Sequence, residues 1–437
     1  MAEINRAVKG TNDILPNEIY KWQFVENTML ETARQFGFEE IRVPVFEHTE
    51  VFKRSVGDTT DVVQKEMYTF DDKGGRSITL RPELTAGVIR SVLENGLTNG
   101  PLPLKVCYIG GCYRYEKPQA GRLREFHQFG VECVGASSPN ADAEVICLAR
   151  HVLNNIGIRK ISLEINSIGC PECRKKYQEA LKEYFRSNID TLCDTCKDRL
   201  ERNPMRILDC KSPVCKTLCE KAPVVLDYLC EECEEHFKNV KKYLDAAQVE
   251  YTVNPHIVRG LDYYTRTVFE FVSGDIGAQS TVCGGGRYDG LISQMGGQPT
   301  ASLGFAMGIE RLMMVLENQK SEIPTGAPTD LYVAVMGEKA SLKACMLCNN
   351  LRADGFNVQT DICGRGLKAQ MKFANKIKAL FTLVLGDSEL EENKAKLKNM
   401  ATGEETEVQL DTLSDDLFKA KNKFALDMLT DSICNEG

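Results

Sequence analysis

The spacing of apolar and polar residues divides the first part of the chain into helical and strand-like segments. From Lys21, KWQFVENTMLETARQFGF has apolar residues three and four positions apart, which predicts an amphipathic helix. EIRVPVFEHTEVF, starting at Glu40, reads as a strand, and Pro44 limits it to a sheet edge or an irregular end. SITLRPELTAGVIRSVLEN then predicts a strand that turns at Arg81-Pro82 into a second helix.

Two longer strands are predicted next, from Lys105 to Tyr115 and from Glu125 to Gly135, joined by a polar basic loop. Hairpins with one apolar face belong to antiparallel sheets. Because side chains alternate between the faces of a strand, polar residues of each strand are expected to share one face. These residues are Arg114 and Glu116 on the first strand, and Gln128 and Glu132 on the second.

The polar face of this hairpin has two interpretations. It is either an ordinary solvent-exposed sheet surface or the floor of a binding site. Lys117, Arg122 and Arg124 in the connecting loop favour a site, because their cationic groups suit contacts with phosphate. Glu83 is equally open: an acid at a strand-to-helix turn commonly caps the helix, but it also suits a substrate ammonium group.

The composition changes sharply between about 170 and 250, where nine of the 18 cysteines lie among many Lys and Glu residues. We expect an inserted, mainly helical module there. The motifs CPEC and CDTC have the spacing of a closed, structural four-thiolate zinc site, although reduced thiols without metal remain the alternative. Their cysteines are Cys170, Cys173, Cys193 and Cys196, and a second, more loosely spaced set is Cys210, Cys215, Cys230 and Cys233.

Strand character returns after Val253, and this part ends in the helix-like SLGFAMGIERLMMVLEN, which contains Arg311. In this part, residues 257–271, IVRGLDYYTRTVFEF, place Arg259 and Asp262 among apolar residues. A charge in such surroundings is costly unless it is paired or binds a ligand. The two residues therefore form either an internal ion pair or part of a pocket for an anionic substrate. The glycine-rich CGGGRYDGL lacks phosphate-loop spacing, and its glycines suit a close approach of backbone.

The last part of the chain follows a linker, TGAPTD, at 325–330. Beyond it, LYVAVMG, FNVQTDI and LFTLVLG alternate with two helical segments. That order predicts a small α/β domain with a mainly parallel sheet.

Bulk properties narrow the class of protein. The 437 residues are too many for a single core, and 43% hydrophobic with 27% charged residues is typical of a folded chain. The absence of a signal-peptide core and of a run of about 18 apolar residues leads us to expect a cytoplasmic protein without a membrane span. The net charge of -8 means that nucleic-acid binding would depend on local basic patches. No nucleophile motif is present, so covalent catalysis is not expected.

Six motifs stand together in one order: KGTNDILP, TLRPELTAG, YRYEKPQAGRLREFHQFGVE, IVRGLDYYTRTVFEF, CGGGRYDGLI and GFAMGIERL. With them, the chain resembles the class II aminoacyl-tRNA synthetases over essentially its whole length. RGLDYY and GGGRYDGL are similar to motifs of the histidine-specific members, whereas the hairpin and the last helix are shared more widely in the class.

The resemblance implies an α+β catalytic domain with an antiparallel sheet, a mainly helical Cys-rich insertion and a C-terminal α/β anticodon-binding domain. The expected boundaries are 1–169 and 253–324 for the two parts of the catalytic domain, 170–252 for the insertion and 330–437 for the last domain. It also implies a homodimer that uses L-histidine, ATP with Mg²⁺ and tRNA(His). Such an enzyme forms histidyl-adenylate and pyrophosphate, and then transfers histidine to the 3′ end of the tRNA.

The resemblance also assigns residues to roles. Those that bind histidine would be Glu83, Thr85, Gln128, Glu132, Arg259, Tyr263, Tyr264 and Tyr288, and those that bind ATP would be Arg114, Glu116, Arg122 and Arg311. Arg259, Arg114 and Arg311 would be the catalytic residues. Arg259 would meet the substrate carboxylate and the α-phosphate, where a permanently charged guanidinium stabilises the transition state without taking a proton.

The main alternative is the histidine-binding regulatory subunit of ATP phosphoribosyltransferase, which resembles the synthetases but has no anticodon-binding domain. The C-terminal α/β segment and the intact RGLDYY argue against it. A zinc-dependent RNA-binding protein would explain the cysteines but not the paired Glu, Arg and Tyr motifs.

Overall fold

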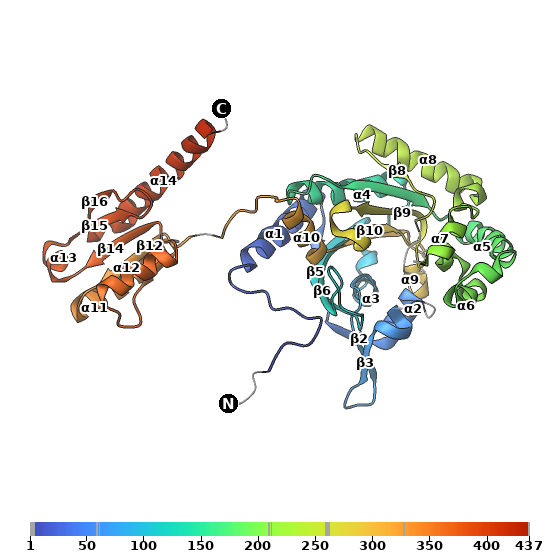
Figure 1. Cartoon of the computed structure of the whole chain (residues 1–437), viewed down its shortest axis with the longest axis horizontal. Helices are drawn as coiled ribbons and strands as arrows, with labels where there is room; N and C mark the ends of the chain where they lie inside the picture. Colours follow the sequence, from blue (N-terminus) through green and yellow to red (C-terminus); the bar gives the residue numbers. More distant parts are fainter. Residues whose placement is uncertain are drawn as a thin grey trace. The chain divides into compact units, whose positions relative to one another are not determined.

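The computed structural model describes residues 5–57, 60, 62–208, 210, 212–257, 263–326 and 328–435. The chain divides into two compact units, Met1–Pro324 and Thr325–Gly437, each built around its own β-sheet (Figure 1). Within the described residues, none of the helices has the length and apolar character needed to cross a membrane.

An eight-stranded sheet forms the centre of the first unit. Its strands, in spatial order, are β1 (Glu39–Glu40), β5 (Leu104–Tyr113), β6 (Glu125–Val134), β11 (Ser302–Gly308), β10 (Thr281–Arg287), β9 (Thr265–Val272), β7 (Ser162–Ser167) and β8 (Thr252–Val253). The six central strands pair antiparallel, and only the short outermost strands β1 and β8 pair parallel. The predicted antiparallel sheet is therefore confirmed, together with the hairpin of β5 and β6.

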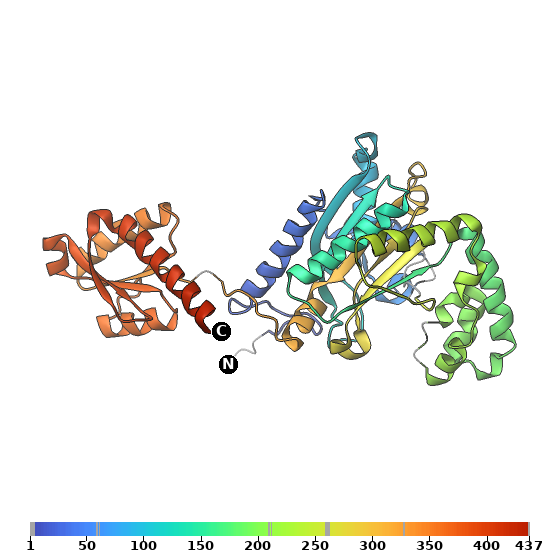
Figure 2. The same cartoon turned by 90° about the horizontal axis from the view of Figure 1, so that it is seen from above.

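Four helices cover one face of this sheet and enclose the main core (Figures 1 and 2): α1 (Ile19–Gln35), α4 (Pro139–Asn155), α8 (Glu231–Ala246) and α10 (Ile309–Asn318). The spacing predicted for α1 is realised, because Val25, Met29 and Ala33 follow one another on its buried side. Full burial of a side chain such as Met29 contributes about 1.5–3 kcal/mol to folding. At the start of α4, Ser138 accepts a hydrogen bond from the Asn140 N–H and Pro139 occupies the first turn.

The opposite face of the sheet is only partly covered. Helix α3 (Thr85–Glu94) packs there through Val88 and Val92, which meet Val106 and Tyr108 of β5. Beside it lie α9 (Leu291–Gln294), α2 (Thr49–Val56) and a three-stranded sheet of β2 (Phe46–His48), β4 (Ser77–Leu80) and β3 (Tyr68–Asp71). The remaining part of this face is open to a ligand.

The strand predicted from Glu40 to Phe52 is wrong for most of its length. After β1 the backbone has no regular structure until β2, and α2 then begins at Thr49. The guanidinium of Arg81 donates hydrogen bonds to the carbonyls of Val43 and Pro44 at 2.8 and 3.3 Å. These carbonyls are thus satisfied by a side chain, and Pro44 has no N–H to offer a neighbouring strand.

The segment predicted as helix-like, SLGFAMGIERLMMVLEN, is also different in its first half. Ser302–Gly308 forms strand β11 between β6 and β10, and the helix α10 begins only at Ile309. Pairing with a strand on each side satisfies the backbone of this segment, which overrides the helical spacing of its side chains.

The inserted segment is helical, as predicted. It consists of α5 (Pro171–Arg186), α6 (Asp194–Arg202) and α7 (Pro213–Cys219), which pack around a core of their own that includes Tyr177 and Phe185 (Figure 2). Helix α8, within the segment expected as the insertion, instead buries Phe237 and Val240 in the main core. The separately packed part thus ends near the start of α8.

The second unit has a five-stranded sheet in the order β13 (Val358–Thr360), β12 (Leu331–Val335), β14 (Phe381–Leu385), β15 (Lys394–Asn399) and β16 (Glu405–Gln409). Its helices are α11 (Glu338–Ala353), α12 (Leu367–Lys376), α13 (Asp387–Glu392) and α14 (Leu413–Asn435). The first three strands are parallel, as predicted. The antiparallel pair β15 and β16 was not predicted, because KAKLKN and ETEVQ have few apolar residues.

Candidate functional site

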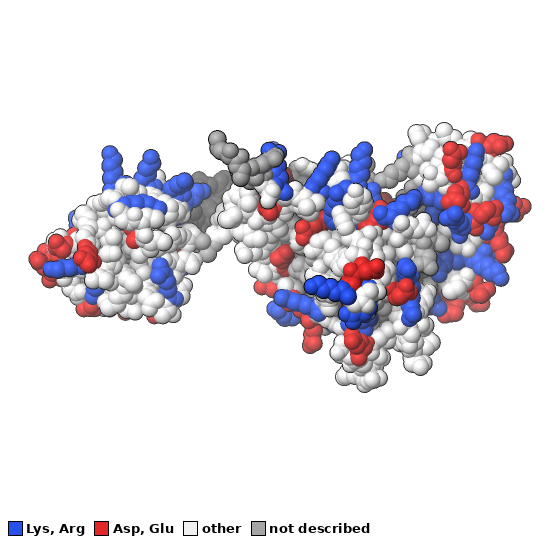
Figure 3. Space-filling view, turned by 90° about the horizontal axis from the view of Figure 1, so that it is seen from below, with Lys and Arg blue, Asp and Glu red and all other residues white. Residues whose placement is uncertain are grey.

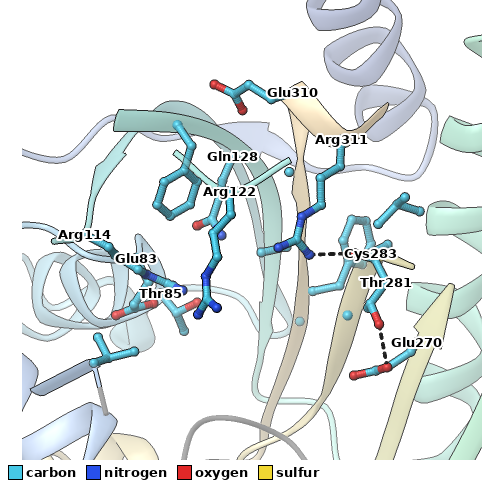
Figure 4. A pocket seen from close by; sticks show the side chains of 18 of the residues that line it. Glu83, Thr85, Arg114, Arg122, Gln128, Glu270, Thr281, Cys283, Glu310 and Arg311 are labelled. Carbon is cyan, nitrogen blue, oxygen red and sulfur yellow. Dashed lines mark hydrogen bonds between the residues drawn. The ribbon is translucent and has the colours of Figure 1, made fainter. Parts of the chain in front are cut away.

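A cavity of about 310 Å³ lies on the open face of the large sheet (Figure 4). Every described residue that the resemblance assigns to histidine or ATP lines it, whereas Lys117 and Arg124 of the hairpin loop do not; the lining residues are Glu83, Thr85, Arg114, Glu116, Arg122, Gln128, Glu132, Tyr263, Tyr264, Tyr288 and Arg311. These residues come from α3, the β5–β6 hairpin, the segment before β9, the end of β10 and α10. The sheet therefore brings together motifs that are far apart in the sequence.

Glu132 on β6 lies at the buried end of the cavity, with only 1% of its surface exposed. The hydroxyl of Tyr108 donates a hydrogen bond to its Oε1 at 2.8 Å, and the hydroxyl of Tyr288 donates to its Oε2. Burial raises the pKa of the Glu132 carboxyl to about 8, although these phenol donors favour the charged form. A buried carboxyl between two phenols is suited to reading a polar side chain.

Glu83 stands just before α3, and the first of its two predicted roles is observed. Its Oε1 accepts a hydrogen bond from the Ala86 N–H at 3.0 Å, so it caps the helix. It also lines the cavity beside Thr85, and burial raises the pKa of its carboxyl. Glu83 and Glu132 together give this end of the cavity two buried acidic groups.

Three arginines also line the cavity, and one of them, Arg114, lies beside Glu83 (Figure 4). Arg311 on α10 donates to the carbonyls of Gly121 and Thr281 at 2.9 and 2.8 Å, which fixes its guanidinium beside β10 (Figure 4). Arg114 donates to the Pro82 carbonyl at 2.8 Å and lies over the ring of Phe126. Burial, followed by the nearby positive charges of Arg114 and Arg122, lowers the pKa of Arg311. Mutual repulsion among these cations makes an anionic ligand favourable there.

The hairpin polar face differs in one respect from its prediction. Strand β5 ends at Tyr113, so Arg114 and Glu116 lie in the connecting loop rather than on the strand. They still reach the cavity that Gln128 and Glu132 line from β6. Within the loop, Glu116 forms an ion pair with Arg122. The loop thus carries a counter-charge for one of its own arginines.

Gly304 leaves room for the acidic end of the cavity. It lies directly opposite Glu132 in the pairing of β11 with β6. A methyl group at this position would collide with the Glu132 carboxylate and with the Val131 carbonyl. A central strand normally disfavours glycine, so its presence here is explained by the buried carboxylate on the neighbouring strand.

Aromatic residues close the acidic end. The rings of Tyr263 and Tyr264 lie 4.7 Å apart, and that of Tyr288 lies 5.5 Å from Tyr263. All three are buried. Arg259 and Asp262, which raised the choice between an ion pair and a pocket wall, lie outside the described residues, and that choice stays open.

Sequence reasoning missed several residues of the cavity, including Glu270 on β9, Thr281 and Cys283 on β10 and Glu310 on α10. The Thr281 hydroxyl donates to Glu270 Oε2 at 2.9 Å (Figure 4). The alternation in VFEFV was the available signal, because it sets Glu270 on the face opposite Phe269 and Phe271.

The cysteines of the insertion form two clusters, but each cluster joins one pair from the first expected set to one pair from the second. Cys170 and Cys173 meet Cys230 and Cys233 in what we call the root cluster, and Cys193 and Cys196 meet Cys210 and Cys215 in the distal cluster. The single set of Cys170, Cys173, Cys193 and Cys196 is therefore corrected. Each C-x2-C motif begins a different helix, and the fold brings it to a later pair.

Both clusters have dimensions suited to a tetrahedral metal. Their four sulfur atoms lie within 4.8 Å of one another, with 3.5 Å between Cys170 and Cys173 and 3.8 Å between Cys193 and Cys210. Zinc–sulfur bonds of 2.3 Å place tetrahedral ligands about 3.8 Å apart. Burial raises the pKa of the Cys170 thiol, but N–H donors at the start of α5 outweigh it and lower the pKa to about 7.

The antiparallel sheet and the cavity on its open face define the chain as a class II aminoacyl-tRNA synthetase. The model of the family described as histidyl-tRNA synthetase matches residues 10–312, and the model of the anticodon binding domain matches residues 330–419. The chain belongs to the histidyl-tRNA synthetase family.

Individual relatives agree with the family models. The histidine–tRNA ligase of Acetivibrio thermocellus is 54% identical over 410 residues, which cover 94% of this chain and 98% of the relative. The histidine–tRNA ligase of Caldanaerobacter subterraneus subsp. tengcongensis is 55% identical over 410 residues, which again cover 94% of this chain and 98% of the relative. The crystal structure of apo S. aureus histidyl-tRNA synthetase has 40% sequence identity and a TM-score of 0.81, and covers 95% of this chain and 100% of its own.

Proposed function

We propose that this chain joins L-histidine to tRNA(His) in two steps driven by ATP. One observation carries the proposal: a single cavity is lined by two buried carboxyl groups, three buried phenols and three arginines. An amino acid with a cationic or hydrogen-bonding side chain suits the carboxyl and phenol groups, and a triphosphate suits the arginines.

The acidic end would bind histidine. Glu83, Thr85 and Gln128 would receive the α-ammonium group. Glu132 and Tyr264 would hydrogen-bond the imidazole, while Tyr263 and Tyr288 would close the pocket. A site that hydrogen-bonds a polar side chain rejects analogues without it by roughly 10⁴–10⁵, so selection in this pocket would need no separate editing domain.

The three arginines would bind ATP. Arg114, Arg122 and Arg311 would hold its phosphates, with Glu116 towards the adenine end. Arg259 would stabilise charge on the α-phosphate while a carboxylate oxygen of histidine attacks it and pyrophosphate leaves. Mg²⁺ would neutralise phosphate charge, and Glu270 offers a carboxylate in the cavity of the kind that magnesium prefers.

Further parts of the proposal concern assembly and location. Residues 330–437 would read the anticodon of tRNA(His), and residues 1–169 and 253–324 would carry the chemistry in a cytoplasmic homodimer. The 170–252 insertion would contain structural zinc. Figure 3 shows basic and acidic side chains interspersed on one face of the first unit, so tRNA contacts would depend on local groups of Lys and Arg.

The test of the first step is the exchange of labelled pyrophosphate into ATP with each of the 20 amino acids supplied singly. We expect exchange with histidine alone, because only the imidazole satisfies Glu132 and its phenols. Exchange driven by another amino acid would contradict the proposal. Histidine binding without exchange would instead support the regulatory-subunit alternative, which lacks the anticodon-binding domain matched at residues 330–419.

A further inference from the structure

We propose that the root cluster binds a zinc ion that holds one wall of the histidine pocket in place, whereas a second zinc ion in the distal cluster stabilises only the inserted segment. The inference deepens the proposed function, since it rests on structural zinc in the insertion and on histidine binding at the acidic end of the cavity.

The root cluster lies where the inserted segment leaves and rejoins the main body. Cys170 caps α5 just beyond the end of β7, and Cys230 caps α8, which returns to the main core. The second cysteine of each motif lies three positions later, in the first turn of its helix. The Cys230 N–H donates to Cys173 Sγ at 3.1 Å, so the two helix starts already contact each other. An ion bound by the root cluster would link the two ends of the insertion.

Arg266, near the start of β9, contacts the chain beside both cysteine pairs of the root cluster. The Arg266 N–H donates to the Gly169 carbonyl at 2.8 Å, next to Cys170. The Arg266 guanidinium pairs with Glu232 at 2.5 Å, and Glu232 stands between Cys230 and Cys233. Arg266 has a φ of 50°, an unfavourable value for a residue with a side chain, so neighbouring contacts must maintain it.

Arg266 connects the root cluster with the proposed histidine pocket. Tyr264, which lines the cavity, is two residues away, and Tyr263 precedes it. The Ile168 N–H donates to the Arg266 carbonyl at 2.8 Å, which completes a backbone pair beside these tyrosines. Release of the ion would free Gly169 and Glu232 together and allow the tyrosine-bearing segment to move.

The distal cluster is an internal comparison within the same chain. Cys196 and Cys215 belong to the core of the inserted segment. The cavity is lined by no residue of α5, α6 or α7 within the described part of the chain. Loss of the distal ion should therefore loosen the insertion without changing the histidine pocket.

The experiment compares Cys170→Ser/Cys173→Ser with the matched distal variant Cys193→Ser/Cys196→Ser, in full-length protein purified without chelator. Metal analysis should find two zinc ions per chain in the parent, one for each cluster, and one in each variant. The root variant should bind histidine about tenfold more weakly by calorimetry, since small displacements of a binding group have effects of this size or larger. Its affinity for ATP, and both affinities of the distal variant, should stay within about twofold of the parent.

If a variant fails to fold, a second measurement on the parent protein tests the same inference. Chelator treatment followed by measured return of Zn²⁺ should weaken and then restore histidine binding. Parent protein without zinc, or root-variant protein with unchanged histidine affinity, would overturn the inference. Neither result depends on catalysis. Pyrophosphate exchange by the parent protein therefore tests the proposed function separately from this inference.

Discussion

Arg311→Ala is expected to lower the rate of histidine-dependent pyrophosphate exchange by roughly 10²–10³, which is the size of effect seen when one preorganised electrostatic group is removed from a reacting centre. The guanidinium is held by the carbonyls of Gly121 and Thr281, so it is positioned before ATP arrives. Removing it leaves Arg114 and Arg122 without the third arginine of the cavity. Exchange kinetics at several ATP concentrations measure the loss.

The matched control is Arg76→Ala. This arginine is 68% exposed and pairs with Asp72 in the turn between β3 and β4, away from the cavity. It should exchange at the parental rate. If Arg311→Ala also kept that rate in folded protein, the assignment of Arg311 to the ATP phosphates would be wrong.

Glu132→Gln is expected to raise the KM for histidine by roughly 10- to 100-fold, with a much smaller change in the KM for ATP. The amide keeps the shape of the carboxyl group but replaces one of its oxygens with an NH2 donor, and a buried donor or acceptor left unsatisfied costs about 1–3 kcal/mol. Glu144→Gln is the control, because Glu144 pairs with Lys105 and does not line the cavity. Equal KM values for histidine in Glu132→Gln and the parent would remove Glu132 from the recognition of the imidazole.

The same substitution should change how stability depends on pH. The pKa of the Glu132 carboxyl is raised to about 8, from an ordinary value of 4.5, so the folded chain holds this proton more tightly than the unfolded chain. Between these two pH values the unfolded chain loses the proton first, and the carboxyl increasingly destabilises the fold as pH rises. Glu132→Gln abolishes this contribution, so denaturant titrations should show its stability relative to the parent increasing from pH 5 to pH 8.

Period-two alternation was sufficient to place Gln128 and Glu132 on one face, because β6 pairs with a long strand on each side and has little freedom in register. It failed for Arg114 and Glu116, since the strand ends one residue before Arg114 and the loop conformation decides where they lie. The place of Arg311 could not be predicted from spacing for a different reason: only the fold brings α10 to the hairpin loop, where the Gly121 carbonyl accepts its hydrogen bond.

The thiol clusters show a similar limit. Spacing identified C-x2-C motifs as metal-ligand pairs, and in the structure the two cysteines of each motif do lie together. Spacing could not identify the partner of each pair, because Cys170 and Cys230 meet only after the helices between them have folded. The strand at Ser302–Gly308 was missed for the same kind of reason, since its hydrogen bonds are all made to residues distant in sequence.

The most direct test of the proposed function is the charging of unfractionated tRNA with labelled histidine and ATP, followed by identification of the charged species. Histidine is expected to become attached to the 3′ end of tRNA(His) alone. Charging of a different tRNA, or pyrophosphate exchange with no charging of any tRNA, would contradict it.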